Sequence, residues 1–220
     1  LSPMLDIAIK TNKLYLYENC IVRKINTDFD GLAKGVEMIN TKSKKIYNFS
    51  SDVIVISASP FESVRLLLSS FCLKHPNGLG NSSGLLGKYI LEHIPSEYFG
   101  FLPNELLSKE NINDLNPFKP NKDPHGFYIA PFKEKNDFKN NFRGKFQIQG
   151  SISLKQKSIY LLAFGETIPS KNNFLKIDIN NKDKWGLPIC KINFNWSQND
   201  IEMWKYQNKI LEELINNFEK

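Results

Sequence analysis

The sequence predicts a mixed α/β protein, and three observations support this class. Short apolar segments of strand length recur along the 220 residues. A continuous β-branched run at residues 53–56 is followed by a helix signal, as in an α/β unit. Residues 197–220 carry apolar side chains at the spacing of one helix face. The chain therefore combines several strands with at least two helices.

The first part of the chain predicts an antiparallel meander of about three strands. Extended segments are expected at residues 14–17 and 20–24, and then at 33–38 and 45–49. The segment Asp28-Phe29-Asp30-Gly31 predicts the first reversal, because Asp and Gly tolerate the backbone dihedrals of a turn.

The run at residues 53–56 is Val-Ile-Val-Ile, which predicts a strand buried on both faces, as in a parallel sheet. It ends in a tip of small residues, Ala58-Ser59, before Pro60, which suits the first turn of a helix. Small residues at the end of such a strand let a dinucleotide approach the backbone closely. Ala58 and Ser59 are therefore candidate cofactor-binding residues.

The second half of the chain predicts mostly strands, followed by one long helix. Paired strands are expected at residues 145–154 and 158–164, and two more strands at 174–178 and 189–196. Ser197 suits the N-cap of the final helix, with Asp200 three residues later in a capping-box arrangement. The apolar stripe of this helix is expected to contain Ile201, Trp204, Leu211, Leu214, Ile215 and Phe218.

The net charge of +6 does not by itself indicate a nucleic-acid partner. Only Arg23, Arg65 and Arg143 are arginines, and the lysines are scattered along the whole chain. Phosphate and base recognition favours clustered charge and the forked guanidinium group. No apolar run approaches the ~20 residues of a transmembrane helix. We expect no nucleic-acid partner and no transmembrane segment.

The three cysteines, Cys20, Cys72 and Cys190, are far apart and form no CxxC pair. This spacing supports neither a zinc site nor a thioredoxin-like centre. The sparse, odd count argues against a disulfide framework and suits a reducing compartment such as the cytoplasm. We interpret them as small buried apolar residues.

Candidate catalytic residues are few. His75, His93 and His125 show no metal-ligand spacing. His93 follows Glu92 and is a candidate for an oriented acid–base pair, although a structural histidine is the commoner case. Glu166 ends a strand, either at a pocket rim or as a solvated acid. We assign no catalytic residue and no metal ligand.

Four sequence blocks occur in a distinctive order. Residues 14–38 contain Val22-Arg23-Lys24-Ile25 and Gly35-Val36-Glu37; residues 52–69 are DVIVISASPFESVRLLLS; residues 78–93 are GLGNSSGLLGKYILEH; and residues 164–188 contain Gly165-Glu166 and the turn DKWGLP. Taken together, these blocks resemble the glucose–methanol–choline (GMC) oxidoreductase family.

The resemblance implies part of an FAD-binding Rossmann-like domain with a β-meander over residues 1–98. It implies a mostly antiparallel substrate-binding domain with a C-terminal helix over residues 99–220. Val22 would meet the adenine of FAD through its backbone, and Ala58 and Ser59 would lie beside the ribose–pyrophosphate part. The substrate would be a small CH–OH donor, an alcohol, sugar or polyol, with hydride passing to flavin N5.

The chain departs from the family pattern at several positions. Ser59 stands where the family usually has Gly, Val64 where Pro or Ser is usual, and Phe174 where Arg is common. Neither the amino-terminal GxGxxG nor the carboxy-terminal segment with the active-site His is present. The resemblance therefore implies an internal fragment that is inactive alone, to which a complementary fragment would supply the ends.

Two other hypotheses remain open. The chain could be a small non-enzymatic α/β binding module whose sheet face binds a partner that is not a nucleotide. It could also regain enzyme activity by assembling with products of adjacent genes that encode the two ends.

Overall fold

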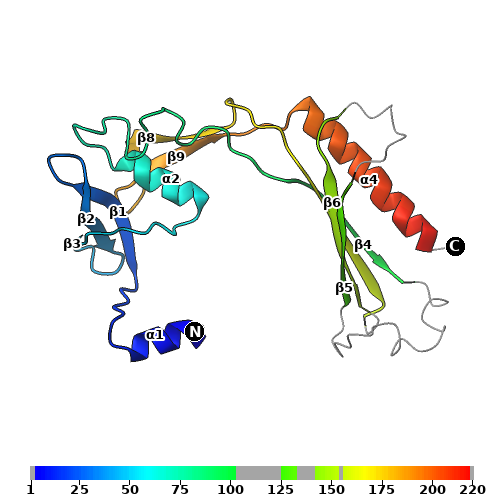
Figure 1. Ribbon diagram of the computed structural model, residues 1–220, viewed down its shortest axis with the longest axis horizontal. Coiled ribbons are helices and arrows are strands. Elements are labelled where there is room, and N and C mark those ends of the chain that lie inside the picture. Colours follow the sequence, from blue (N-terminus) through cyan, green and yellow to red (C-terminus); the bar gives the residue numbers. More distant parts are fainter. Residues whose placement is uncertain (1–2, 103–124, 133–141, 154–155, 219–220) are drawn as a thin grey trace. The chain divides into compact units, whose positions relative to one another are not determined.

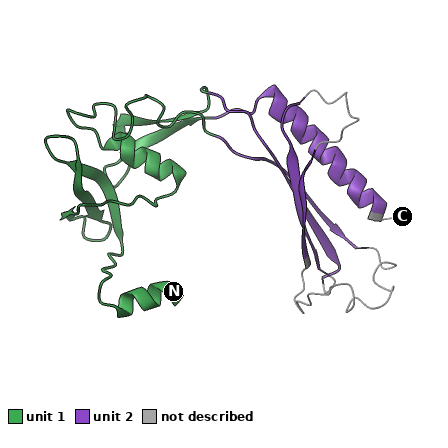
Figure 2. Cartoon of the chain, in the orientation of Figure 1, with its two compact units in different colours: residues 1–90, 171–193 green, residues 91–170, 194–220 purple. Residues whose placement is uncertain are grey.

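The computed structural model describes residues 3–102, 125–132, 142–153 and 156–218 (Figure 1). It confirms a mixed α/β protein, with three antiparallel sheets and a long C-terminal helix. The chain divides into two compact units, shown in different colours in Figure 2. The first unit comprises residues 1–90 and 171–193, and the second comprises residues 91–170 and 194–220.

The first unit contains the predicted meander. Strands β1 (Cys20–Thr27), β2 (Ala33–Asn40) and β3 (Ile46–Ser50) pair antiparallel in the order β1-β2-β3. The turn between β1 and β2 is also confirmed, because the N–H of Gly31 donates to the Asp28 carbonyl over 3.1 Å. One prediction before the sheet is wrong, because residues 14–17 are not a strand. Helix α1 (Pro3–Lys10) was not predicted.

Helix α2 (Pro60–Ser69) begins at Pro60, as the sequence predicts. Its buried Leu66 joins Ile25 of β1 and Leu79 of the following loop in the core cluster of the first unit. The half-buried side chains packed against this cluster are Val22, Val36, Ile54, Ile56 and Leu67. The meander and α2 therefore share one small core.

The prediction of a doubly buried strand at residues 53–56 is wrong. Residues 53–57 alternate between exposed and half-buried side chains, as an extended segment does, but they pair with no strand in the described parts of the chain. Val53 is 75% exposed and Val55 is 82% exposed, whereas Ile54 and Ile56 pack against the core cluster. The continuous apolar run indicated burial on both faces of a strand, but the core cluster of the first unit packs on only one face of the segment.

A two-stranded hairpin completes the first unit. Strands β8 (Phe174–Lys182) and β9 (Pro188–Asn193) pair antiparallel and contact α2. The sequence predicted both strands with somewhat different bounds, but did not indicate that residues 171–193 pack with the first ninety residues. The proposed functional division into residues 1–98 and 99–220 stays a prediction.

The second unit is a four-stranded antiparallel sheet with one helix. The strands are β4 (Ile94–Phe101), β5 (His125–Phe132), β6 (Phe146–Ser153) and β7 (Ser158–Gly165), and their order is β4-β7-β6-β5. The β6–β7 pair was predicted, whereas β4 and β5 were not. Helix α4 (Gln198–Phe218) contacts β4 and β7.

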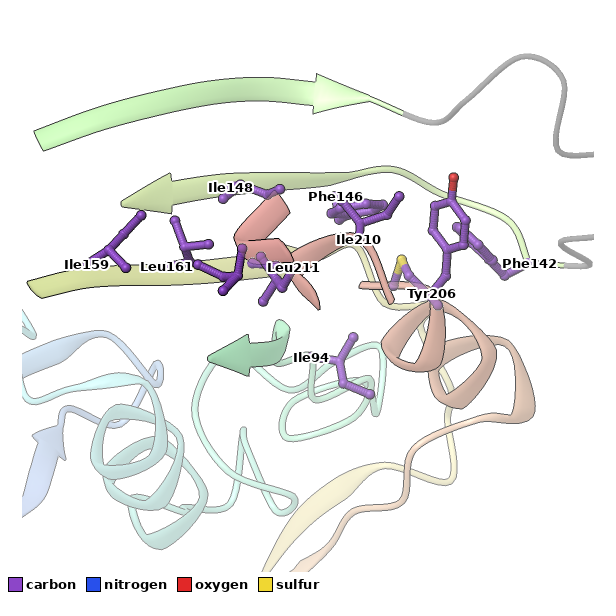
Figure 3. Close-up of a cluster of buried hydrophobic side chains, with 12 residues drawn as sticks. Ile94, Phe142, Phe146, Ile148, Ile159, Leu161, Tyr206, Ile210 and Leu211 are labelled. Carbon is purple, nitrogen blue, oxygen red and sulfur yellow. The ribbon is translucent and has the colours of Figure 1, made fainter. Parts of the chain in front are cut away.

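The core of the second unit lies between this sheet and α4 (Figure 3). Ile148 of β6 and Leu161 of β7 meet Met203 and Leu211 of α4, all essentially inaccessible. The predicted stripe of α4 is partly wrong, because Trp204 is 44% exposed. The buried positions instead recur at helical spacing as Met203, Tyr206, Gln207, Ile210, Leu211 and Ile215.

The predicted capping box at the start of α4 is confirmed. The Ser197 N–H donates to the Asp200 carboxylate over 2.8 Å, and the Asp200 N–H donates to the Ser197 hydroxyl over 3.2 Å. Within the described residues, no helix combines the length and the apolar character that crossing a membrane requires.

Candidate functional site

The predicted nucleotide tip lies where the extended segment 53–57 meets α2. Ala58 and Ser59 are both exposed, and Ser59 is the N-cap of the helix. The Ser59 side chain makes no capping hydrogen bond, and Pro60 follows it at the first helical position. The first turn of α2 is therefore not capped by its own N-cap side chain.

The backbone of Ser59 has φ 74° and ψ 158°. This combination belongs to a region that is populated almost only by glycine, and it costs a side-chain-bearing residue on the order of 1–3 kcal/mol. Strain of this kind concentrates at ligand sites, and a helix N-terminus with free N–H groups attracts anions. The tip therefore combines a strained backbone with two small, exposed side chains at a helix N-terminus.

Val22, the third predicted cofactor residue, lies on β1, which is an edge strand of the meander. An edge strand keeps backbone groups on one side that no neighbouring strand uses. Val22 packs against the same core cluster as Ile54 and Ile56, which precede the tip. The structure therefore places the three predicted cofactor residues in one unit, with only Val22 packed against its core cluster.

The sequence blocks meet one another within the first unit. The Ile25 N–H of β1 donates to the Ser70 hydroxyl at the end of α2, a buried bond of 2.8 Å. The Leu175 N–H of β8 donates to the Gly87 carbonyl over 2.7 Å. Gly87 has φ +81°, and a Cβ atom there would lie 2.4 Å from the Leu175 oxygen, so only glycine fits.

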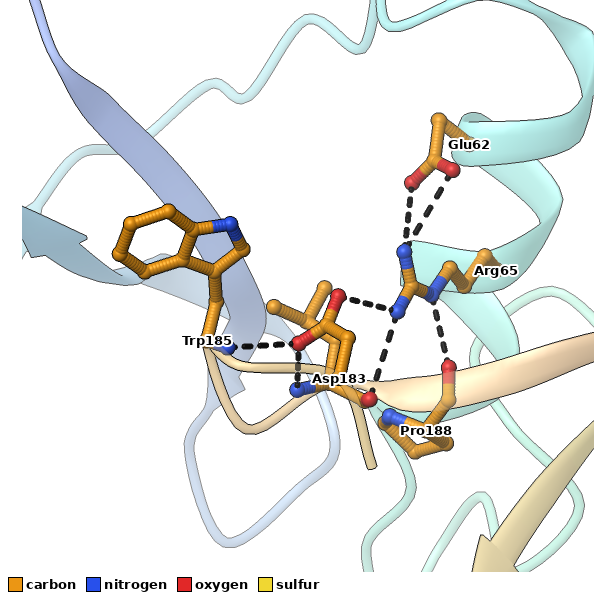
Figure 4. A network of polar contacts seen from close by, with 6 residues as sticks. Glu62, Arg65, Asp183, Trp185 and Pro188 are labelled. Atoms are coloured by element: carbon orange, nitrogen blue, oxygen red, sulfur yellow. Dashed lines mark hydrogen bonds and ion pairs between the residues drawn. The ribbon is translucent and has the colours of Figure 1, made fainter. Parts of the chain in front are cut away.

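An ion-pair network, shown in Figure 4, joins α2 to the β8–β9 turn. Arg65 Nη2 lies 2.7 Å from Asp183 Oδ2, and Arg65 Nε donates to the Pro188 carbonyl over 2.8 Å. The other Asp183 oxygen accepts the N–H groups of Trp185 and Leu187. The tip-bearing helix is thereby attached to the hairpin.

The charges of this network stabilise each other. Burial disfavours the ionised Asp183, but its hydrogen bonds from Arg65 and from the backbone of Leu187 and Trp185 outweigh that cost. The pKa of the Asp183 carboxyl is therefore lowered. Burial likewise opposes the charge of Arg65, and Asp183 together with Glu62 nevertheless raises the pKa of its guanidinium. The sequence named these residues within its blocks but did not predict that they pair.

The second unit contains another candidate site, a cavity of about 370 Å³ lined by Leu91, Glu92, His93, Glu166 and Thr167. His93 Nδ1 lies 3.2 Å from the Gly165 carbonyl, and the Thr167 hydroxyl donates to the Glu92 carbonyl. The sequence flagged Glu92-His93 and Glu166 separately, and the structure places them around one cavity. The sequence did not predict this arrangement, because Glu166 lies far along the chain from Glu92-His93.

The tautomer of His93 follows from its partner. A carbonyl oxygen only accepts, so Nδ1 carries the proton in the bond to Gly165. In the neutral ring, Nε2 then has the lone pair that can accept a hydroxyl proton or hydrogen bond. Among the described residues, no group of three or more His, Cys, Asp or Glu side chains could hold a metal ion.

The residues around the tip would hold one edge of a dinucleotide and not the whole of it. Ala58 and Ser59 provide a small, exposed surface at a helix N-terminus. The sequence has no GxGxxG, so the usual pyrophosphate-binding loop is not among these residues.

Comparison with known proteins gives one informative similarity. No family model matches the sequence. The chain is 29% identical over 215 residues to a 2-methyl-1,2-propanediol dehydrogenase of Mycolicibacterium austroafricanum. The similarity covers 84% of this chain and 37% of the dehydrogenase, so the chain spans little more than a third of that relative.

Proposed function

We propose that this chain is part of an FAD-dependent oxidoreductase that acts on CH–OH donors, an alcohol, sugar or polyol. The observation that carries the proposal is the similarity to a diol dehydrogenase over most of the chain. The conformation of Ser59 supports it, because a glycine-like backbone at a helix N-terminus suits a dinucleotide. The order of the four sequence blocks adds the resemblance to the GMC family.

In this proposal the chain contributes the edge of the flavin site. Ala58 and Ser59 lie beside the ribose–pyrophosphate part, and the backbone of Val22 lies against the adenine. A bound flavin would supply the redox chemistry: it would accept hydride from the carbon of the CH–OH group while a base takes the hydroxyl proton, so that a carbonyl forms. The Arg65–Asp183 pair holds α2, and with it the tip, against the β8–β9 hairpin.

We further propose that a complementary polypeptide segment pairs with residues 53–57. Val53 and Val55 expose most of their side chains, and this extended segment has no strand partner within the described residues. A strand added at this edge would bind through main-chain hydrogen bonds and would cover both valines. The phosphate-binding loop that this chain lacks would come with that segment.

A chimera tests the proposal directly. This chain would replace the matching 37% of the M. austroafricanum dehydrogenase, and flavin absorbance and dye reduction with 1,2-diols would be measured. We expect a chimera that binds FAD in equal molar amount and oxidises a diol. The purified chain alone should bind FAD weakly and show no turnover.

Two matched variants sharpen the result. Ala58→Trp in the chimera places a bulky ring at the tip and should abolish flavin binding. Ser82→Trp adds the same ring at an exposed loop position of the same unit and should leave flavin binding unchanged. A folded chimera without flavin, or equal flavin content in both variants, contradicts the proposal.

The alternative function, a non-enzymatic α/β binding module, makes the opposite prediction. The isolated chain would then melt cooperatively and would bind no hydrophobic dye, because it would leave no large apolar patch for a partner to cover. The exposure of Val53 and Val55 favours the flavoprotein.

A further inference from the structure

The first unit also contains a cavity, which lies at the C-terminal end of α2, whereas the tip lies at the N-terminal end. Its volume is about 220 Å³. The cavity is lined by three cationic side chains, Arg23, Lys24 and Lys182, and by a single carboxylate, Glu37. Ser69, the last residue of α2, also lines it.

A β-bulge directs Arg23 toward this cavity. Val22 pairs with Met38 and Lys24 pairs with Glu37, so Arg23 is the extra residue of β1 between them. Bulges are common next to functional sites because they turn a side chain away from the regular alternation. Here the bulge places Arg23 beside Lys24, so both cations of β1 line the cavity.

Two buried polar atoms on this wall lack hydrogen-bond partners. They are the Nε of Arg23 and the hydroxyl of Ser69, whose side chain is more than nine-tenths buried. The nearest ion-pair contact of Arg23 is a long one, 3.7 Å from Nη1 to Glu37 Oε1. Buried donors are rarely left unpaired in native proteins, so these two indicate an acceptor that enters the cavity.

The electrostatic balance favours an anion. Three cations face one carboxylate, which leaves two positive charges uncompensated. The C-terminus of α2 adds a partial negative charge of about one half, which is too small to reverse the sign. Arg23, Ser69 and Lys182 belong to β1, α2 and β8, so an anion in the cavity would be contacted from three elements, which suits a ligand with several acceptor oxygens, such as phosphate.

We propose that this cavity binds a phosphate group, free or as the monoester of a small molecule. Both unpaired atoms are closed to solvent, so binding requires a change of the Ser69 side-chain rotamer and a small shift of the Arg23 guanidinium away from Glu37. The site is separate from the tip, because Ser59 and Ser69 lie at opposite ends of a ten-residue helix about 15 Å long. The proposal does not depend on the flavin.

The test is a titration of the full chain with inorganic phosphate, followed by calorimetry and by thermal unfolding at constant ionic strength. We expect saturable binding at one site and a higher unfolding temperature, with sodium chloride giving neither. Arg23→Gln and Ser69→Ala should each weaken phosphate binding roughly tenfold, the effect of one charge-assisted hydrogen bond. Glucose 1-phosphate against free phosphate distinguishes a monoester ligand from the bare ion.

Arg143→Gln is the matched control, because it removes the same guanidinium charge in the second unit and should leave phosphate binding unchanged. Ser69→Ala has a second readout that a merely structural role would not give. Without phosphate it should unfold at the same or a higher temperature, because it removes a buried unpaired hydroxyl. Equal phosphate affinity in Arg23→Gln and the wild type, or an effect of chloride equal to that of phosphate, overturns the proposal.

Discussion

The Arg65–Asp183 pair allows a quantitative prediction about the stability of the first unit. The perturbation is Arg65→Met, which keeps the aliphatic stem and removes the guanidinium. It deletes the 2.7 Å contact with Asp183 and the 2.8 Å hydrogen bond to the Pro188 carbonyl. The Arg65 side chain is 12% exposed and that of Asp183 is 28% exposed, so the pair is mostly but not fully buried.

The magnitude lies between two limits. Exposed ion pairs contribute about 0–1 kcal/mol, whereas removing one partner of a buried pair costs about 3–5 kcal/mol. After the substitution, Asp183 still accepts hydrogen bonds from two backbone N–H groups and is still partly exposed to solvent. The loss of stability should therefore be smaller than that for a fully buried pair. We expect Arg65→Met to lower the free energy of unfolding by about 2–3 kcal/mol.

Two further variants should give smaller effects in a fixed order. Asp183→Asn retains an oxygen for the backbone donors but loses the charge, and it should cost about 1.5 kcal/mol. Glu62→Gln should cost about 0.5 kcal/mol or less, because Glu62 is 53% exposed and lies 3.3 Å from Arg65. The expected order is therefore Arg65→Met, Asp183→Asn, Glu62→Gln.

The assay is urea denaturation followed by the fluorescence of Trp185, which lies in the turn that the pair holds. All variants would carry Trp196→Phe and Trp204→Phe, so that only the first unit contributes to the signal. A loss of 2–3 kcal/mol shifts the midpoint by roughly 1–2 M urea. If Glu62→Gln destabilised the unit as much as Arg65→Met, the reasoning from burial would be refuted.

The same pair predicts a pH dependence. The pKa of Asp183 is lower in the folded unit than its unfolded value of 3.8. Its stabilising contribution is therefore complete above that value and is lost as the pH falls through the folded-state pKa. The unit should lose stability in acid below about pH 4, and the Asp183→Asn variant should lose less over the same window. Parallel curves for the two proteins would refute this assignment.

Three further predictions concern single residues. Ser59→Gly should raise the free energy of unfolding of the first unit by about 1 kcal/mol in denaturation, because the strain that it relieves exceeds the entropic cost of a more flexible unfolded chain. A loss of stability would contradict the strained conformation. A hydrogen bond with Thr27 lowers the pKa of the Cys72 thiol, whereas burial raises the pKa of the Cys190 thiol. Iodoacetamide should therefore label Cys72 before Cys190 near neutral pH, and equal labelling of the two by mass spectrometry would contradict this. Ser197→Ala should lower the stability of the second unit by about 1 kcal/mol in thermal melts, and an unchanged melt would argue against the capping box.

Features set by local chemistry could be predicted from the sequence. The Asp28–Gly31 turn needs only residues that tolerate reversal, and the Ser197–Asp200 box satisfies helix N–H groups within one turn. Both were predicted and both are present. Helix α2 also begins where Pro60 indicates, because a proline loses nothing at a position whose N–H has no helical partner.

Features set by distant contacts could not be predicted. Trp204 was placed on the buried stripe of α4 because it is large and apolar, but the sheet contacts the face that carries Met203 and Gln207. Gln207 is fully buried, with its amide oxygen accepting the Gly165 N–H and its nitrogen donating to the Ile94 carbonyl. A polar residue at a core position gives no sequence signal, because its partners are strand ends far away along the chain.

The cavity around His93 was missed for the same reason. Glu92-His93 directly precedes β4 and Glu166 follows β7, and each is unremarkable in its own segment. They come together only because β4 and β7 pair with Ile94 opposite Gly165. Register between strands that are some seventy residues apart is a property of the folded sheet.

The misjudged segment at residues 53–56 carries the most functional information. Covering a fully exposed valine contributes about 1.5–3 kcal/mol, so a strand laid over Val53 and Val55 would contribute about 2–5 kcal/mol at their observed exposure. That gain is comparable to the strain of about 1–3 kcal/mol at Ser59, three residues beyond the segment. A partner that covers the valines could therefore offset the cost of holding Ser59 in its glycine-like conformation. Exposed apolar side chains and a strained backbone are both unusual in a stable fold, and where they lie side by side we expect them to serve one site. The strand partner and the nucleotide should therefore bind to it together.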